Sequence, residues 1–104
     1  MIEPTDNIGT ALLFENDRVR VWDLALAPGE WLEKHIHRND YLFMVVDGGS
    51  LRHVDPENPQ NDRDVQFEAN KVVFLEAGEG QVHERLVNTG DTPYRNIIVE
   101  LKRP

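Results

Sequence analysis

Two histidines, His35 and His37, lie two residues apart in a segment predicted to be a β-strand. Side chains at positions i and i+2 of a strand point to the same face of a sheet, so two imidazoles with this spacing can bind one metal ion. His83 lies far downstream and would complete a three-imidazole set if the fold brings the two segments together. The spacing alone also fits a solvent-facing strand that carries two histidines. The fourth histidine, His53, is expected outside the ligand set.

The elements that would position these histidines are short strands. Turn-forming residues recur along the chain, and six prolines and seven glycines interrupt it too often for long helices. The intervening segments are rich in valine, isoleucine, leucine and aromatic residues, and no window shows a convincing helical stripe. This pattern predicts an all-β sandwich or barrel. The expected strands cover residues 19–26, 31–37, 41–46, 51–54, 65–67, 72–75, 82–87 and 94–101.

Length and composition limit the possible chemistry. The chain has 104 residues, which is enough for one domain with one core and one pocket. It has no cysteine, which excludes disulfides, zinc fingers, iron–sulfur clusters and a thiol nucleophile. A metal would therefore be held by His, Asp, Glu or Tyr side chains. The formal charge of −8 argues against nucleic-acid binding. No apolar stretch is long enough to span a membrane and the N-terminus lacks signal-peptide features, so a cytoplasmic protein is expected.

The surroundings of the histidine pair resemble the first motif of the cupin superfamily, G-x5-H-x-H-x3,4-E-x6-G. In this chain the motif begins at Gly29, reaches His35 and His37 at the required spacing, and ends at Gly48. Every spacing is met. The one departure is Tyr41, which stands where the motif has glutamate.

The second cupin motif, P-x-G-x2-H-x3-N, is matched less closely. Gly78 replaces the proline, Gly80 and His83 keep their positions, and Asn88 falls one residue late. The resemblance covers roughly residues 14–102 and is closest to small, stand-alone bacterial cupins.

This resemblance implies a single cupin-type jelly-roll β-barrel, a double-stranded β-helix, at residues 14–104. The preceding residues 1–13 are expected to form an N-terminal arm that is loosely held over residues 1–10. It also implies a divalent metal ion bound by His35, His37 and His83. Without the glutamate the ligand set is neutral. Three-histidine cupins include dioxygenases that bind iron(II), so iron(II) is the favoured metal, with zinc, nickel or manganese as alternatives.

Several side chains near the expected site have more than one interpretation. Tyr41 is expected to hydrogen-bond a bound water or the substrate, to ligate as a phenolate, or simply to line the barrel. Arg85 lies two residues after His83 and is expected either to clamp a substrate carboxylate or to form a salt bridge. Glu33 and Asp40 are candidate fourth ligands, with a solvated carboxylate and a turn residue as the respective alternatives. Five apolar residues are expected to line the barrel or to form its core: Trp31, Phe43, Val45, Val73 and Ile98.

The sequence therefore predicts a metal-dependent oxidoreductase, a dioxygenase that acts on a small organic acid or carbonyl compound, with Tyr41 and Arg85 as catalytic residues. One alternative is a redox-neutral metal-dependent isomerase or lyase. Another is a cupin that binds a small ligand without catalysis. A small-molecule substrate and a homodimer are the expected partners, and a nucleic acid or a membrane is not.

Overall fold

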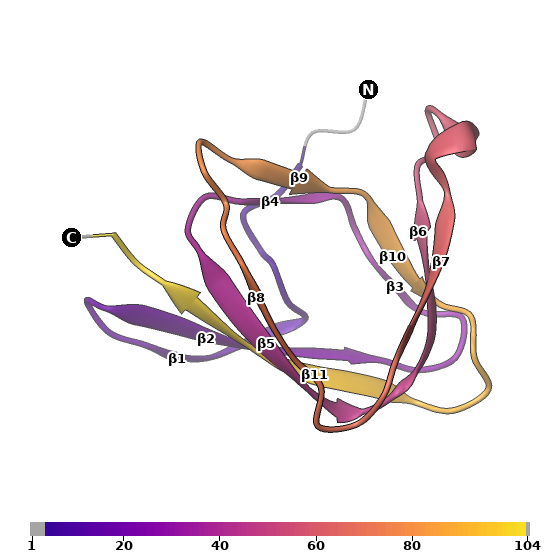
Figure 1. The fold of residues 1–104 in the computed structure, drawn as a ribbon, viewed down its shortest axis with the longest axis horizontal. Helices are drawn as coiled ribbons and strands as arrows, with labels where there is room; N and C mark the ends of the chain where they lie inside the picture. The colour runs from indigo at the N-terminus through magenta and orange to yellow at the C-terminus, as the bar shows by residue number, and fades with distance from the viewer. Residues whose placement is uncertain (1–3, 104) are drawn as a thin grey trace.

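The computed structural model describes residues 4–103, which form strands and one short 3-10 helix (Figure 1). No helix within this part of the chain is long and apolar enough to cross a membrane. The elements are β1 (Ala11–Glu15), β2 (Val19–Leu26), β3 (Trp31–Leu32), β4 (His35–His37), β5 (Tyr41–Asp47), β6 (Gly49–Val54), η1 (Pro59–Asn61), β7 (Arg63–Phe67), β8 (Val72–Leu75), β9 (Gln81–His83), β10 (Arg85–Asn88) and β11 (Tyr94–Leu101).

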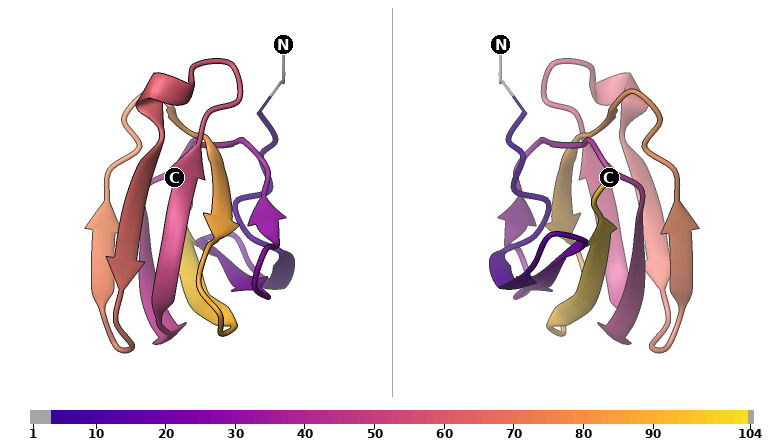
Figure 2. Two further views of the ribbon diagram at one scale, coloured as in Figure 1. Left: turned by 90° about the vertical axis from the view of Figure 1, so that its right-hand side faces the viewer. Right: turned by 90° about the vertical axis from the view of Figure 1, so that its left-hand side faces the viewer.

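The strands form three antiparallel sheets. A five-stranded sheet has the order β1-β2-β11-β5-β8, a four-stranded sheet has the order β3-β10-β6-β7, and β4 pairs with β9. In Figure 1 the two larger sheets diverge from one end of the molecule, and the β4–β9 pair lies across the other end between them. The left view of Figure 2 has the four-stranded sheet toward the viewer and the right view the five-stranded sheet. This arrangement confirms the predicted all-β jelly-roll fold.

Within the described residues, the sheets of this jelly roll do not close into one continuous hydrogen-bonded barrel. The chain leaves the four-stranded sheet at Glu33 and Lys34, between β3 and β4, and rejoins it after Glu84, between β9 and β10. These two interruptions separate the small β4–β9 sheet from its neighbours. It is this small sheet that carries the three histidines of the predicted ligand set.

The core lies between the inner faces of the sheets. Along β11 every second residue is buried, which is the period of a strand with one face on a core. Ile98 of β11 packs there with Leu24 of β2, Val45 of β5 and Leu51 of β6, all at most 3% exposed. The inner faces thus form one apolar interior that extends toward the β4–β9 pair.

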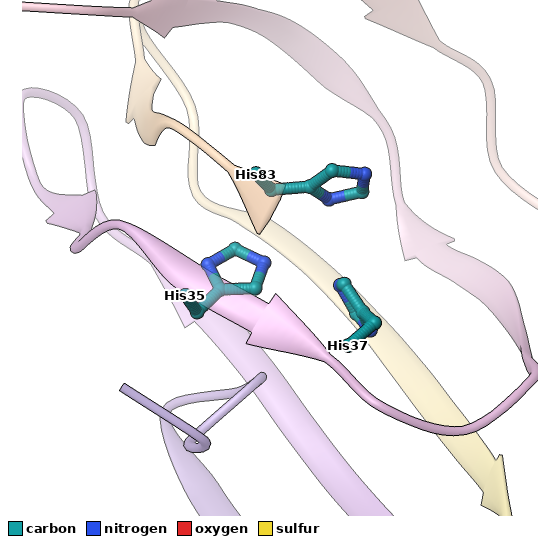
Figure 3. A group of neighbouring side chains, drawn as sticks. All are labelled: His35, His37 and His83. Carbon is teal, nitrogen blue, oxygen red and sulfur yellow. The ribbon is translucent and has the colours of Figure 1, made fainter. Parts of the chain in front are cut away.

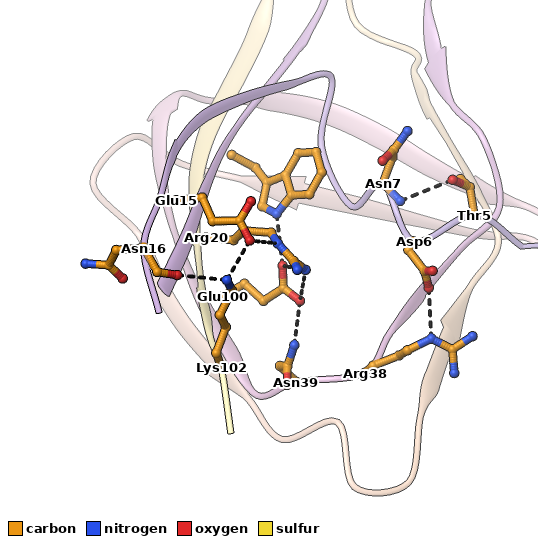
Figure 4. A network of polar contacts seen from close by, with 11 residues as sticks. Thr5, Asp6, Asn7, Glu15, Asn16, Arg20, Arg38, Asn39, Glu100 and Lys102 are labelled. Carbon is orange, nitrogen blue, oxygen red and sulfur yellow. Dashed lines mark hydrogen bonds and ion pairs between the residues drawn. The ribbon is translucent and has the colours of Figure 1, made fainter. Parts of the chain in front are cut away.

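A buried carboxylate ties the five-stranded sheet to the loop that follows β4 (Figure 4). Glu100 is 4% exposed and accepts hydrogen bonds from Trp22 Nε1 at 3.0 Å and Asn39 Nδ2 at 2.7 Å, with Arg20 at 3.5 Å. Glu100 also lies opposite Tyr41 in the β11–β5 ladder. These bonds compensate the cost of burying a charge and fix the chain between His37 and Tyr41.

The described part of the predicted arm is held against the sheets. Residues 1–3 lie outside the described residues. Thr5 exchanges backbone hydrogen bonds with Lys34 and Ile36, and Ile8 is 1% exposed within the core. β1 then begins at Ala11. The expectation of a loose arm was therefore wrong for this part, because the isolated apolar residue Ile8 inserts into the core and gives no periodic signal in the sequence.

Two glycines of the first motif have backbone reasons to be glycine. Gly29 has a φ of +83°, a conformation that is costly for residues with a Cβ atom. Gly48 sits so close to β7 that a Cβ atom would lie 2.5 Å from the Phe67 carbonyl oxygen. Gly29 thus allows the turn before β3, and Gly48 allows the close approach to β7 after β5.

Candidate metal centre

The antiparallel pairing of β4 with β9 brings the three histidines together. His35 lies directly opposite His83 in this ladder, and His37 lies two residues further along the same face. One ligating nitrogen from each of the three lies within 4.8 Å of the others. Figure 3 shows the rings converging on one space, with ring centroids 4.7 to 5.4 Å apart. These three residues, His35, His37 and His83, are called the histidine triad below.

The triad is neutral near pH 7. Burial lowers the pKa of His37 to about 3, and electrostatic interactions with the neighbouring His35 and His83 contribute to this shift. Burial, with His35, His53 and Arg63 nearby, lowers the pKa of His83 to about 4. Burial also lowers the pKa of His35. Each ring therefore keeps a free nitrogen lone pair, which is the form that binds a metal ion.

Two hydrogen-bonding details fit the triad to a metal ion. His35 Nδ1 lies 2.9 Å from the Glu33 carbonyl oxygen, so Nδ1–H donates there and Nε2 carries the lone pair. A metal-ligating histidine normally donates its other nitrogen to such a partner. His37 Nδ1 is buried without a hydrogen-bond partner within residues 4–103. The triad thus offers three neutral nitrogen donors, of which His35 is oriented by its hydrogen bond and His37 has a buried nitrogen without a partner. Such a set suits a divalent metal ion with affinity for imidazole.

Tyr41 lies beside the triad and is hydrogen-bonded to a neighbour in the small sheet. Its ring stacks on His37 with centroids 3.8 Å apart and an interplanar angle of 11°. Its hydroxyl donates to Gln81 Oε1 at 3.2 Å, and burial raises the pKa of Tyr41 well above its usual value. Tyr41 lines the wall of the site with its O–H held by Gln81, which lies opposite His37 in the small sheet.

The two candidate carboxylate ligands point elsewhere. Glu33 is exposed, and its carboxylate accepts hydrogen bonds from Trp31 Nε1 at 3.2 Å and Arg85 Nε at 2.9 Å. Asp40 Oδ1 accepts from the Ala77 backbone N–H at 2.9 Å, which is the turn role given as its alternative. Within the described chain, the cluster that could hold a metal contains only imidazoles. The absence of the motif glutamate is not compensated by a neighbouring carboxylate.

Arg85 does not share the inward face of His83, contrary to the expectation. Its guanidinium forms an ion pair with Glu33 at 2.9 Å and lies over the Trp31 ring, 5.1 Å from its centroid. The reason is the break at Glu84 between β9 and β10, which reverses the alternation so that Leu86, not Arg85, points inward. The structure thus gives Arg85 the salt bridge that was its alternative. Trp31 is likewise 53% exposed rather than part of the lining.

The triad forms part of the wall of a cavity of about 240 Å³ between the sheets. Of the predicted apolar lining, Phe43, Val73 and Ile98 do line the cavity, while Val45 belongs to the adjoining core. The remaining lining residues are Ile8, Leu24, Tyr41, His53, Arg63, Val65, Phe67, Leu75, Gln81, Leu86, Tyr94 and Asn96. The interior is therefore mostly apolar, and its polar groups come from the triad, Tyr41, His53, Arg63, Gln81, Tyr94 and Asn96.

Among the polar lining residues that the sequence did not predict, His53 and Arg63 lie on the wall beyond His83. The His53 ring lies 6.0 Å from the His83 ring, centroid to centroid, and Arg63 lies opposite His53 in the β6–β7 ladder. The position of His53 had a signal in the sequence, because it lies two residues after Leu51 and so on the same strand face. Arg63 had none, because it follows an irregular polar loop.

Comparison with known proteins gives the fold a name. No family model matches the sequence, and no curated protein matches it. Among solved structures, a cupin domain from Bordetella pertussis Tohama I is similar over 99% of this chain and 100% of its own, with 23% identity and a TM-score of 0.75. An RmlC-like cupin with a double-stranded β-helix fold from Methanocaldococcus jannaschii is similar over 95% and 86%, with 14% identity and a TM-score of 0.66.

A polyketide cyclase from Streptomyces resistomycificus is also similar, over 86% of this chain and 58% of its own, with 18% identity and a TM-score of 0.61. At these identities the likeness establishes the fold. The chain has the cupin fold, as its two motifs predicted, and it covers the full length of the Bordetella domain.

Proposed function

We propose that this cupin-fold chain binds a divalent metal ion, with iron(II) favoured, and is a dioxygenase of a small organic acid or carbonyl compound. The observation that supports this most strongly is the composition of the triad. Three neutral imidazoles converge within 4.8 Å, and no carboxylate joins them within residues 4–103. A neutral ligand set leaves the metal its full positive charge and leaves positions for a substrate oxygen atom and O₂.

The residues around the triad support this chemistry by position. An iron(II) ion bound there would supply Lewis acidity and the activation of O₂. Gln81 holds the Tyr41 hydroxyl at the wall, where it can donate a hydrogen bond to a substrate oxygen after turning from Gln81. Phe43, Val73 and Ile98 make the adjoining wall apolar, which excludes water and strengthens electrostatic interactions inside.

Oxygen consumption tests this proposal. We expect protein loaded with iron(II) under argon to consume O₂ on exposure to air only when a suitable thiol, 1,3-diketone or hydroxy acid is present. Both oxygen atoms should enter the product, which mass spectrometry after ¹⁸O₂ labelling measures. Iron uptake without O₂ consumption with any member of such a panel would contradict the dioxygenase proposal.

A redox-neutral isomerase or lyase is the second candidate function. The fold similarity to a polyketide cyclase favours it, since that name denotes a cyclisation without net oxidation. Such an enzyme would be active under argon with zinc, nickel or manganese. The same panel assayed under argon separates the two candidates, and ligand binding without turnover under either gas would favour a non-catalytic cupin.

We also propose a homodimer, based on the outer face of the five-stranded sheet. The strand registers place Phe14, Val21, Val99, Leu42 and Phe74 in one row across all five strands. Phe14 and Phe74 at its two ends are each 54% exposed. A continuous apolar surface of this kind is unusual on a monomer. A two-fold-related copy presents the same uncharged row, so the surface is complementary to itself.

Substituting Phe74→Glu is expected to dissociate this dimer, because a charge would then face the apolar row of the partner. Light scattering should give about twice the chain mass of 12.0 kDa for the wild type and the chain mass for the variant. Val82→Glu is the matched control, since Val82 is exposed on β9, outside this sheet. A monomeric wild type, or equal dissociation by both substitutions, would contradict the proposed interface.

A further inference from the structure

Arg63 is the cationic side chain that lines the cavity. It begins β7 and lies directly opposite His53 of β6, so the two side chains share the inner face of the four-stranded sheet. The His53 ring in turn lies 6.0 Å from that of His83. Arg63, His53 and the triad thus follow one another along the same wall, and Arg63 is exposed where this wall meets solvent.

Arg63 has no ion-pair partner among the described residues. Its sequence neighbours Asp62 and Asp64 are directed to Arg52, at 4.0 and 2.7 Å. By contrast, Arg85 is paired with Glu33. Exposed arginines are commonly solvated without a carboxylate partner, but Arg63 also lines the cavity. A guanidinium presents several N–H groups in a plane that matches a carboxylate, and here that capacity is unused.

The surroundings of Arg63 favour an anionic ligand. The cavity wall beyond Arg63 is mostly apolar. No described carboxylate stands among the lining residues to repel an anion. Within the described lining, Arg63 thus offers a cationic group and no carboxylate competes for it, although the net charge of the chain is −8.

We propose that Arg63 binds the carboxylate of a small acid in the cavity and thereby directs the rest of that acid toward the triad. This inference rests on the proposed function for the role of the triad, and it assigns the substrate class: a carboxylic acid rather than a neutral carbonyl compound. It transfers to Arg63 the clamp role that the sequence offered to Arg85. The carboxylate is held by the guanidinium N–H groups, and the triad is left for an oxygen atom elsewhere in the same molecule.

Binding measurements test this inference without turnover. The probes are three acid–amide pairs of matched shape: acetate with acetamide, pyruvate with pyruvamide, and phenylacetate with phenylacetamide. Calorimetric titration of zinc-loaded wild-type protein is expected to show at least one acid binding about tenfold more tightly than its amide, because a charge-assisted hydrogen bond replaces a neutral one. Arg63→Met should abolish this preference, and Arg63→Lys should retain part of it. Arg85→Met, which removes a paired arginine outside the cavity, should keep it in full.

Repeating the titrations with metal-free protein separates this inference from the proposed function. If no metal binds but the acid preference still depends on Arg63, the inference stands and the proposed metal chemistry fails. If metal binds and no pair shows an acid preference, or Arg63→Met and Arg85→Met behave alike, the role of Arg63 is overturned. Thermal unfolding of both variants shows that the protein measured is folded.

Discussion

Replacing His35 and His37 together by alanine is expected to abolish stoichiometric metal binding. The two side chains supply two of the three nitrogen donors, which lie within 4.8 Å of one another with the donor from His83. Loss of a residue that merely orients a ligand weakens metal binding by roughly 10–100-fold. Loss of two ligands should therefore weaken zinc binding by at least about a thousandfold. Titration with zinc against a chromophoric chelator measures this change.

The control for this substitution is His53→Ala. His53 is also a histidine of the cavity wall, but it is not a member of the triad. The His53→Ala substitution should leave the zinc affinity within a few-fold of the wild-type value. A large loss in this variant would show that removing any imidazole from the cavity weakens zinc binding. Equal affinities of the double variant and the wild type would show that the triad is not the metal site.

The metal-free protein is expected to lose stability steeply as the pH falls from about 6.5 to about 4. The folded-state pKa values of His37 and His83, about 3 and about 4, lie below the ordinary histidine pKa of 6.5. Between these values the unfolded chain binds more protons than the folded chain, so acid favours unfolding. The stabilisation is complete above pH 6.5 and is lost on acidification. Because of this pKa shift, each histidine lowers the free energy of unfolding at pH 4 by about 3 kcal/mol relative to its value above pH 6.5.

Urea denaturation of metal-free protein at a series of pH values measures this dependence. His37→Gln should flatten the acid limb by the contribution of one histidine, since glutamine does not titrate. Stability that does not change between pH 6.5 and pH 4 would contradict the burial of neutral imidazoles in the triad. So would an acid limb of equal slope in the wild type and the variant.

The triad could be predicted from the sequence because it follows from the spacing of residues within short segments. The i, i+2 spacing puts His35 and His37 on one face, and the motif spacing points to His83, which the β4–β9 register places opposite His35. The same reasoning failed for Arg85, because the break at Glu84 reverses which side chains point inward. Strand alternation predicts a face only as far as the strand continues.

Other features depend on contacts that periodicity does not encode. Arg63 reaches the cavity only because β7 pairs with β6 after an irregular loop, and nothing in the neighbouring sequence marks it. Ile8 is an isolated apolar residue, so no pattern in the sequence predicts that it is buried. Backbone hydrogen bonds of Thr5 with Lys34 and Ile36 hold the preceding segment beside β4. The division into three sheets, rather than one closed barrel, likewise follows from short breaks of one or two residues.

The central claim is that the triad holds a metal ion, and the metal content of the purified protein tests it most directly. The protein is expressed in medium supplemented with iron and zinc, purified without chelators, and measured by plasma mass spectrometry beside the His35→Ala, His37→Ala double variant. Close to one equivalent of a divalent transition metal per wild-type chain, and almost none in the variant, is the predicted result. A folded wild-type protein without such a metal, which also takes up none when iron(II) or zinc is added, would contradict the claim.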